Sequence, residues 1–211
     1  MIELMRDGGP LMWLLLLCSV LATAVFLERL FHYHRASINT SDFMKGLRNV
    51  LKRKNIAEAV SICDETPGPV AHILRAAILR YPASREDVRE SIEDAGLSEV
   101  PRLERNLVVL ATIAHIAPLL GLLGTVLGMI GVFQEIHMHG GVVVTSDLAS
   151  GIWQALLTTA GGLTVAIPAY VAYNYLVSRV DGLVLDMEKC ATEIVHLLTS
   201  EDPYELEHDR D

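Results

Sequence analysis

Residues 151–174 read GIWQALLTTAGGLTVAIPAYVAYN, and this stretch decides the fold. It lies inside residues 148–178, a run of 31 residues without Asp, Glu, Lys or Arg. The hydrocarbon core of a bilayer is about 30 Å thick and is crossed by about 20 helical residues, so the run predicts a transmembrane helix. The stretch also carries five polar side chains among many small residues, namely Gln154, Thr158, Thr159, Thr164 and Asn174.

Two other uncharged runs are long enough to cross a bilayer. Residues 8–27 contain no charged side chain, and residues 107–133 contain none unless His115 is protonated. The chain has 51% hydrophobic residues and a mean hydropathy of +0.36, and its apolar residues are concentrated in these runs rather than spread evenly. We therefore expect an all-α membrane protein whose three transmembrane helices occupy residues 11–30, 106–134 and 148–178.

The basic residues predict the orientation of these spans. Of the 17 Lys and Arg residues, 13 lie in residues 29–105 and none lies in residues 134–147. By the positive-inside rule, the N-terminus (1–10) and the second loop (135–147) are expected in the periplasm, and residues 31–105 and 179–211 in the cytoplasm. The net charge of −9 argues against a basic surface that binds nucleic acid.

The first span is expected to persist as a helix. The tripeptide at residues 22–24, Ala-Thr-Ala, resembles a signal-peptide cleavage site. The preceding MIELMRDGG is not clearly basic, however, and the apolar run continues to Leu27, which favours a permanent span.

The cytoplasmic part is predicted to be a small helical insertion. Apolar residues recur at helical spacing in four short stretches after the first span, and the last, residues 85–105, is highly charged. These stretches are too short for a separate soluble domain of ordinary size. We expect long cytoplasmic extensions of the membrane helices and a C-terminal helix and tail over residues 179–211.

No cofactor, metal or disulfide is expected. Cys18 lies in a span, and Cys63 and Cys190 would face a reducing cytoplasm, which points to packing roles. His137 and His139 have no third ligand nearby and are interpreted as a polar loop. Nucleotide-binding glycine motifs, nucleophile elbows and paired carboxylates within a span are not found, so an enzyme is not expected.

Glycines in the second span recur at spacings of three and four, which places them on one face; they are Gly121, Gly124, Gly128 and Gly131. Small residues so spaced let two helix backbones approach closely in lipid. The third span has a similar broad stripe, comprising Gly151, Gln154, Ala155, Thr158, Thr159, Gly161, Gly162 and Ala166. Pro118 and Pro168 are expected to kink their helices.

Thr125 and Thr159 are expected at one level of the membrane. Thr125 lies about nine residues from the outer end of its span and Thr159 about eleven, a difference of about 3 Å. Two antiparallel spans can therefore bring both hydroxyls together. The alternative is that each hydroxyl bonds to its own helix and the glycines serve packing alone.

The blocks LERNLVVLATIAHIAPLLGLLGTVLGMIGVF (103–133) and GIWQALLTTAGGLTVAIPAYVAYN (151–174) together resemble the ExbB/TolQ/MotA family of proton-channel motor proteins. Three spans favour the ExbB type over MotA, which has four. The resemblance implies a homopentamer in the inner membrane of Gram-negative bacteria. It implies two partners, a single-span ExbD/TolR-like protein with a membrane Asp and a TonB/TolA-like protein that spans the periplasm.

The resemblance also implies site residues. Thr125 and Thr159 match the threonines that family members place next to the partner's Asp, and Thr158 and Gln154 lie beside them. The glycines at 121, 124, 128, 161 and 162 and Pro168 would shape the lumen. Many relatives have Glu at position 154, so Gln154 is a departure, and this chain has no carboxylate at membrane depth.

The expected function is a channel subunit that uses the proton motive force to energise a TonB-like protein for outer-membrane transport. A TolQ-like role in envelope integrity or motility remains open, as does sodium in place of protons, because hydroxyl oxygens suit a hard cation. A passive membrane scaffold without ion flux is the alternative from another class.

Overall fold

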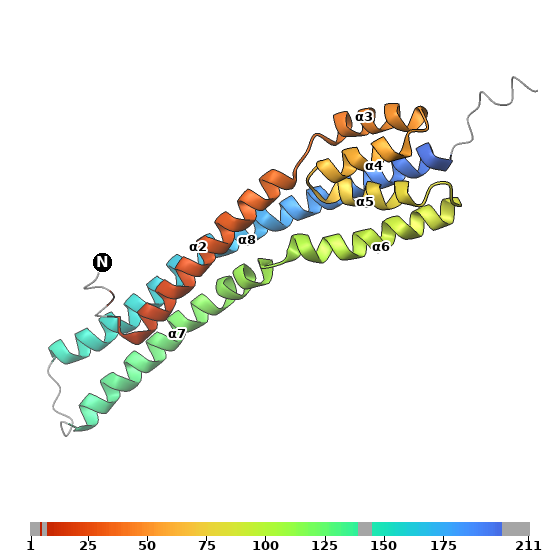
Figure 1. Cartoon of the computed structure of the whole chain (residues 1–211). Helices are drawn as coiled ribbons and strands as arrows, with labels where there is room; N and C mark the ends of the chain where they lie inside the picture. The colour runs from red at the N-terminus through yellow and green to blue at the C-terminus, as the bar shows by residue number, and fades with distance from the viewer. Residues whose placement is uncertain (1–4, 6–7, 139–144, 200–211) are drawn as a thin grey trace, which may run out of the picture. The chain divides into compact units, whose positions relative to one another are not determined.

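The computed structural model describes Met5, residues 8–138 and residues 145–199, except for the side chains of 145–147. Its seven helices contain nearly all of these residues, and none of the described residues lies in a strand (Figure 1). The helices are α2 (Pro10–Ala36), α3 (Thr40–Lys52), α4 (Ile56–Glu65), α5 (Pro69–Leu79), α6 (Arg85–Glu104), α7 (Leu107–Met138) and α8 (Thr145–Thr199). The predicted all-α class is confirmed.

Three helices are long and apolar enough to cross a membrane, namely the one that begins at Pro10, α7, and the one that ends at Thr199. Many of their large apolar side chains are exposed; Leu119 and Ile167, for example, are each 62% exposed. Side chains of this kind would be unfavourable in water and are suited to lipid or to another chain. The chain is a multi-pass membrane protein, as the sequence predicted.

The helices run past the predicted span boundaries. α2 continues to Ala36 and α7 to Met138, and α8 is one helix of 55 residues that includes both the third span and the expected C-terminal helix. The long helical extensions are therefore present. The exact span limits and the sides of the membrane stay predictions.

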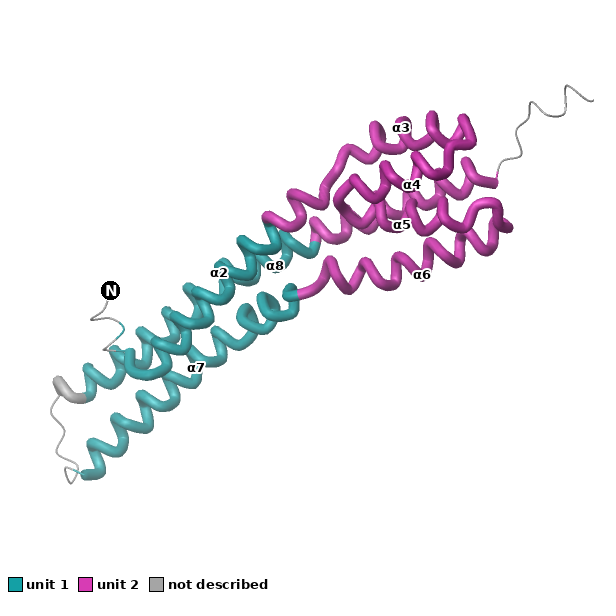
Figure 2. Tube along the Cα trace, viewed as in Figure 1, with its two compact units in different colours: residues 1–30, 106–177 teal, residues 31–105, 178–211 magenta. Residues whose placement is uncertain are grey.

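The chain divides into two compact units (Figure 2). Unit 1 consists of residues 1–30 and 106–177 and holds the apolar parts of α2, α7 and α8. Its buried core is made largely of small side chains in two clusters: Ala22, Ile113, Ala114 and Ala169, and Leu15, Ala117 and Ala166. Because alanine adds so little bulk, the three helix backbones can approach closely.

Unit 2 consists of residues 31–105 and 178–211 and has an ordinary apolar core. α5 packs against both α4 and α6, and its buried side chains include Ile73, Leu74 and Ile78. Three of its helices begin at residues that cap them: Asn39 and Asn55 accept from the backbone of α3 and α4, and Ser84 forms a capping box with Asp87. The fourth, α5, begins with Pro69, whose fixed φ suits the first turn of a helix. These local signals explain why a short, charged segment folds as four separate helices.

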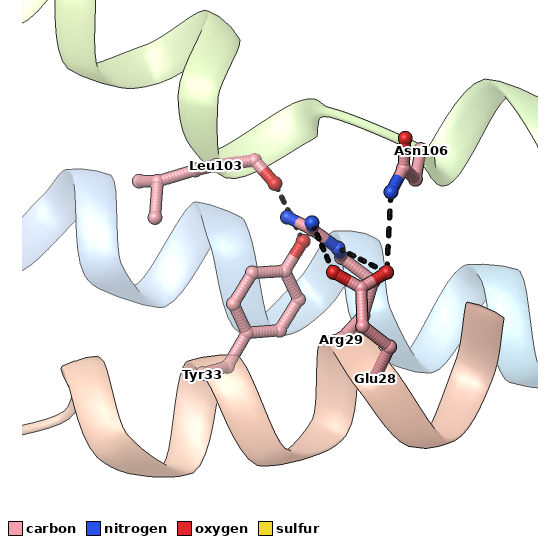
Figure 3. A network of polar contacts seen from close by, with 5 residues as sticks. All are labelled: Glu28, Arg29, Tyr33, Leu103 and Asn106. Atoms are coloured by element: carbon pink, nitrogen blue, oxygen red, sulfur yellow. Dashed lines mark hydrogen bonds and ion pairs between the residues drawn. The ribbon is translucent and has the colours of Figure 1, made fainter. Parts of the chain in front are cut away.

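Figure 3 shows polar contacts that join helices within each unit. In unit 1, Glu28 pairs with Arg29 at 2.6 Å and accepts a hydrogen bond from the Asn106 side chain at 3.1 Å. In unit 2, the Tyr33 hydroxyl donates to the carbonyl of Leu103 at 2.6 Å. Leu103 lies in the last turn of α6, where carbonyls have no partner within the helix. Tyr33 therefore satisfies a buried acceptor that would otherwise be unpaired.

Replacing Tyr33 with Phe is expected to destabilise unit 2. The substitution keeps the ring but leaves the Leu103 carbonyl without its donor, which typically lowers stability by about 1–3 kcal/mol. Thermal unfolding in detergent should show a lower Tm for Tyr33→Phe. Tyr81→Phe is the matched control, because Tyr81 is 38% exposed. Equal Tm values for the two variants would refute the assigned role of Tyr33.

Candidate functional site

The candidate site lies where α7 and α8 pack against each other in unit 1. A Cβ built on Gly121 would lie 3.0 Å from the Thr159 Cα, and one built on Gly128 would lie 2.9 Å from the Ala155 Cβ. A Cβ on Gly162 would lie 2.5 Å from the carbonyl oxygen of Ala117. Residue numbers fall along α7 as they rise along α8, so the helices are antiparallel. We call this contact the glycine seam; it is formed by Ala117, Gly121, Gly124, Gly128 and Val132 on α7 and by Gly151, Ala155, Thr158 and Gly162 on α8.

Thr158 lies at the centre of the glycine seam. Its side chain is only 2% exposed, and its hydroxyl donates to the Ala155 carbonyl at 2.8 Å. A Cβ on Gly124 would lie 2.6 Å from the Thr158 Cβ and would also meet the Thr158 hydroxyl. Thr158 thus fills the space that Gly124 leaves. This geometry supports a packing role for Thr158 within its own chain.

Thr125 and Thr159 lie beside the seam and are both half-buried. Their hydroxyl oxygens are 3.2 Å apart, so the structure brings together the two groups that the depth estimate placed at one level. The Thr159 hydroxyl donates across the helix interface to the Gly121 carbonyl at 2.9 Å. The Thr125 hydroxyl donates to the Leu122 carbonyl of its own helix at 2.7 Å. Their role in ion transfer stays a prediction.

This hydroxyl pair has a defined hydrogen-bonding capacity. A threonine hydroxyl carries one proton and two lone pairs. When both protons go to the carbonyls of Gly121 and Leu122, the remaining lone pairs can accept a hydrogen bond or contact a cation. Either hydroxyl can also turn away from its carbonyl and donate to an anion. The pair can therefore bind either form of a carboxyl group.

Gln154 and Gly161 lie outside the glycine seam. A Cβ on Gly161 would meet the Met12 sulfur of α2 at 2.9 Å. Gln154 is exposed, and its side-chain nitrogen would lie 2.9 Å from a Cβ on Gly9, just before α2. The predicted stripe of α8 is therefore divided between two neighbouring helices.

Most other polar groups in the spans bond to their own helix. Thr112, Thr164 and Asn174 donate to the carbonyl four residues earlier, and the His115 ring contacts the Ala111 carbonyl at 2.6 Å. For these groups, the alternative holds in which a polar side chain bonds to the backbone of its own helix. α8 continues through Pro168, which is exposed.

Sequence reasoning did not identify Gly9, Ala117 or Val132 as part of this region. Gly9 has a φ of +70°, which favours glycine, and its missing side chain leaves room for Gln154. A Cβ built on Gly151 would overlap the side chain of Val132. The only available signal for Ala117 and Val132 was their spacing from the glycines of α7.

The polar groups described at this site are uncharged. Residues 107–133 and 148–178 contain no Asp, Glu, Lys or Arg. Among the described residues, no group of three or more His, Cys, Asp or Glu side chains could hold a metal ion, and His139 lies outside them. These two segments therefore supply no carboxylate next to Thr125 and Thr159.

Comparison with known proteins gives consistent matches. Residues 65–189 match the family model described as the MotA/TolQ/ExbB proton channel family. An ExbB homologue of Methanothermobacter thermautotrophicus is 28% identical over 181 residues, which are 85% of this chain and 64% of the relative. An ExbB-like protein of Synechocystis is 36% identical over 179 residues, 81% of this chain and 68% of the relative.

The biopolymer transport protein exbB1 of Vibrio cholerae is 29% identical over 189 residues, 88% of this chain and 83% of the relative. The match therefore spans most of this chain, although it spans less than two thirds of the Methanothermobacter protein.

Replacing Gly124 with Ala is expected to destabilise the glycine seam. The new methyl group would overlap the Thr158 side chain, and overpacking of this kind typically lowers stability by about 1–3 kcal/mol. Gly131→Ala is the matched control on the same helix, because a Cβ there meets no atom within 4 Å. Thermal unfolding in detergent should show a lower Tm for Gly124→Ala alone. A Tm equal to that of Gly131→Ala would contradict the close contact.

Proposed function

The chain belongs to the MotA/TolQ/ExbB proton channel family, and on that premise we propose that it is the multi-pass subunit of a proton-driven motor in the bacterial inner membrane. Five copies surround a lumen formed by α7 and α8. A single-span partner of the ExbD/TolR type enters this lumen and supplies a membrane Asp. The observation that carries the proposal is the Thr125–Thr159 hydroxyl pair, which is half-buried between two spans that contain no carboxylate.

The hydroxyl pair suits the two states of a carboxyl group that takes up and releases a proton. A protonated Asp donates to a lone pair of Thr125 or Thr159, whereas an ionised Asp receives a hydrogen bond once either hydroxyl turns from its carbonyl. Moving one charge through 100 mV changes the free energy by about 2.3 kcal/mol. A net hydrogen bond to a charged group is worth about 1.5–3 kcal/mol, which is enough to matter on that scale.

Gln154 contributes polarity without a proton-carrying group. Its amide can donate and accept but does not titrate, so the ion pathway depends on the partner's carboxyl group. The proposed pathway therefore comprises Thr125, Thr159 and Gln154, with Thr158 supporting it from the glycine seam. Protons are the proposed ion on account of the family, and sodium is the alternative that the flux assay below distinguishes.

The relatives are named as biopolymer transport proteins, which supports transport across the envelope as the load. We propose that the motor energises a TonB-like protein that spans the periplasm. A TolQ-like role in envelope integrity or motility is the alternative load. The proposed topology has the N-terminus and residues 135–147 in the periplasm and residues 31–105 and the C-terminus in the cytoplasm, because the basic residues are concentrated there.

A passive scaffold is the second candidate, and one observation favours it. The glycine seam joins helices of a single chain, and the hydroxyls of Thr158, Thr159 and Thr125 all have acceptors within that chain. Polar and small residues can therefore be explained by packing alone. The two candidates differ in whether an ion crosses the membrane.

Thr159→Val is expected to abolish proton flux and leave assembly intact. Valine matches the shape of threonine but offers neither a donor nor an acceptor to the partner's carboxyl group. Flux is measured in proteoliposomes that contain the chain and its co-expressed single-span partner, with proton and sodium gradients in turn. Native mass spectrometry on the same preparation checks that five copies still assemble with the partner.

Two controls accompany this variant. Thr164→Val removes an exposed hydroxyl that bonds to its own helix, so flux should remain near the wild-type rate. Thr159→Ser restores the hydroxyl and should recover most of the flux. Unchanged flux in Thr159→Val would remove Thr159 from the pathway, and absence of flux in the wild-type complex would favour the scaffold.

Gln154→Ala is expected to reduce flux by less than tenfold. The amide lends polarity but carries no proton, so other polar groups and water can substitute for it. The measurement is the same proteoliposome assay. Complete loss of flux in Gln154→Ala would show that the amide has an essential role that its lack of titration does not explain.

A further inference from the structure

Unit 2 contains an open groove that the proposed motor function does not use. The groove has a volume of about 620 Å³ and is lined by α6, by the last part of α8 and by Ile73 of α5. Its apolar side chains include Ile92, Val100, Val184, Met187 and Val195. A partly apolar groove at the surface of a small helical unit can serve as a docking site for a peptide segment.

The rim of the groove carries charged side chains of both signs, and its two arginines lie toward one end. Arg85 and Arg89 are in the first two turns of α6, and His196 is in the last turn of α8. Figure 1 shows α6 beginning at the side of unit 2 where α8 ends. Arg89 pairs with Glu93 at 2.9 Å, and Glu188 is a second acidic group on the rim. Within the described ranges, Arg85 forms no ion pair.

We propose that this groove binds the C-terminal tail of the same chain, residues 200–211. The tail reads SEDPYELEHDRD and contains six acidic residues and one arginine. It begins four residues after His196, which lines the groove. Its acidic side chains complement Arg85 and Arg89, and Tyr204 and Leu206 provide apolar groups for the groove floor.

The tail is long enough to extend along the groove. From Arg85 to Gly96 the groove follows α6 for eleven residues, or about 17 Å at 1.5 Å per residue. An extended chain covers up to about 3.4 Å per residue, so Leu206, seven residues beyond Thr199, can reach about 24 Å. The tail can thus turn back beside α8 and place Leu206 near Gly96.

A tail from the same chain is favoured over another occupant because it is always present at high local concentration. A tethered segment binds without the entropy loss of bringing in a separate molecule, so even weak contacts suffice. Residues 200–211 also supply carboxylates that can pair with Arg85 at the end of the groove. The docked tail would cover Val100 and Val184, which are half-buried. This proposal does not depend on ion flux.

The test is disulfide cross-linking in the full chain purified in detergent. Cys18, Cys63 and Cys190 are first replaced by Ala, and Leu206→Cys is combined with Gly96→Cys. A Cβ at Gly96 meets no atom within 4 Å, so a cysteine fits there. The matched control combines Leu206→Cys with Ser98→Cys, because Ser98 is exposed on the opposite face of α6, two residues away.

A docked tail should form the 206–96 disulfide within one chain at least tenfold faster than the 206–98 disulfide. Adding Arg85→Glu should reduce this ratio severalfold, since it reverses the charge at the end of the groove. Linked peptides are identified by mass spectrometry after proteolysis, and gels under non-reducing conditions separate single chains from linked pairs. Elution as the wild-type oligomer shows that each variant folds.

Two results would overturn the proposal. Equal rates for the two cysteine pairs would show that the tail does not prefer the groove. Disulfides that form only between chains would show that the groove takes the tail of another copy.

Discussion

The close contact of α7 with α8 at Gly124 and Thr158 is the constraint on which the membrane part depends. A Cβ on Gly124 would lie 2.6 Å from the Thr158 Cβ, so the backbones can be this near only with glycine on one side. In lipid, apolar burial gives little drive for helix association, and close backbone packing supplies it instead. The same proximity lets Thr159 donate to the Gly121 carbonyl of the other helix. The close packing of α7 against α8 and the hydrogen bond between them therefore both depend on the small residues at this contact.

This constraint also explains how hydroxyls can be placed in a span at low energetic cost. Each described threonine in the seam region satisfies its proton on a nearby carbonyl, so no donor is left without an acceptor in an apolar medium. Thr158 is fully enclosed, whereas Thr125 and Thr159 keep part of their surface open. Adjacent threonines on α8 thus differ in their environment because a rotation of about 100° separates them. One stabilises the contact, and the other can meet a second chain.

The two units differ in which side chains they bury and which they expose. Unit 1 packs mainly through glycine and alanine and leaves large apolar side chains exposed, as suits lipid or neighbouring subunits. Unit 2 buries Leu47, Leu74 and Ile78 almost completely and places charged residues on its surface, as a water-soluble domain does. Along its groove between α6 and α8, the apolar side chains of Val100 and Val184 are only half-buried. The tail 200–211, which we propose as the ligand of this groove, is acidic and contains the apolar side chains of Tyr204 and Leu206.

The sequence by itself determined the three long apolar helices, the helical class and the prediction that Thr125 and Thr159 lie at similar depth, because hydropathy, length and helical rise are properties of each segment alone. The family likewise followed from the two blocks around them. Only the tertiary structure decided which neighbour each small residue meets. The stripe of α8 looked like one surface, yet Gly162 faces α7 and Gly161 faces α2. Helical periodicity fixes the angle between two side chains, but the neighbour that occupies each angle depends on how separate helices pack.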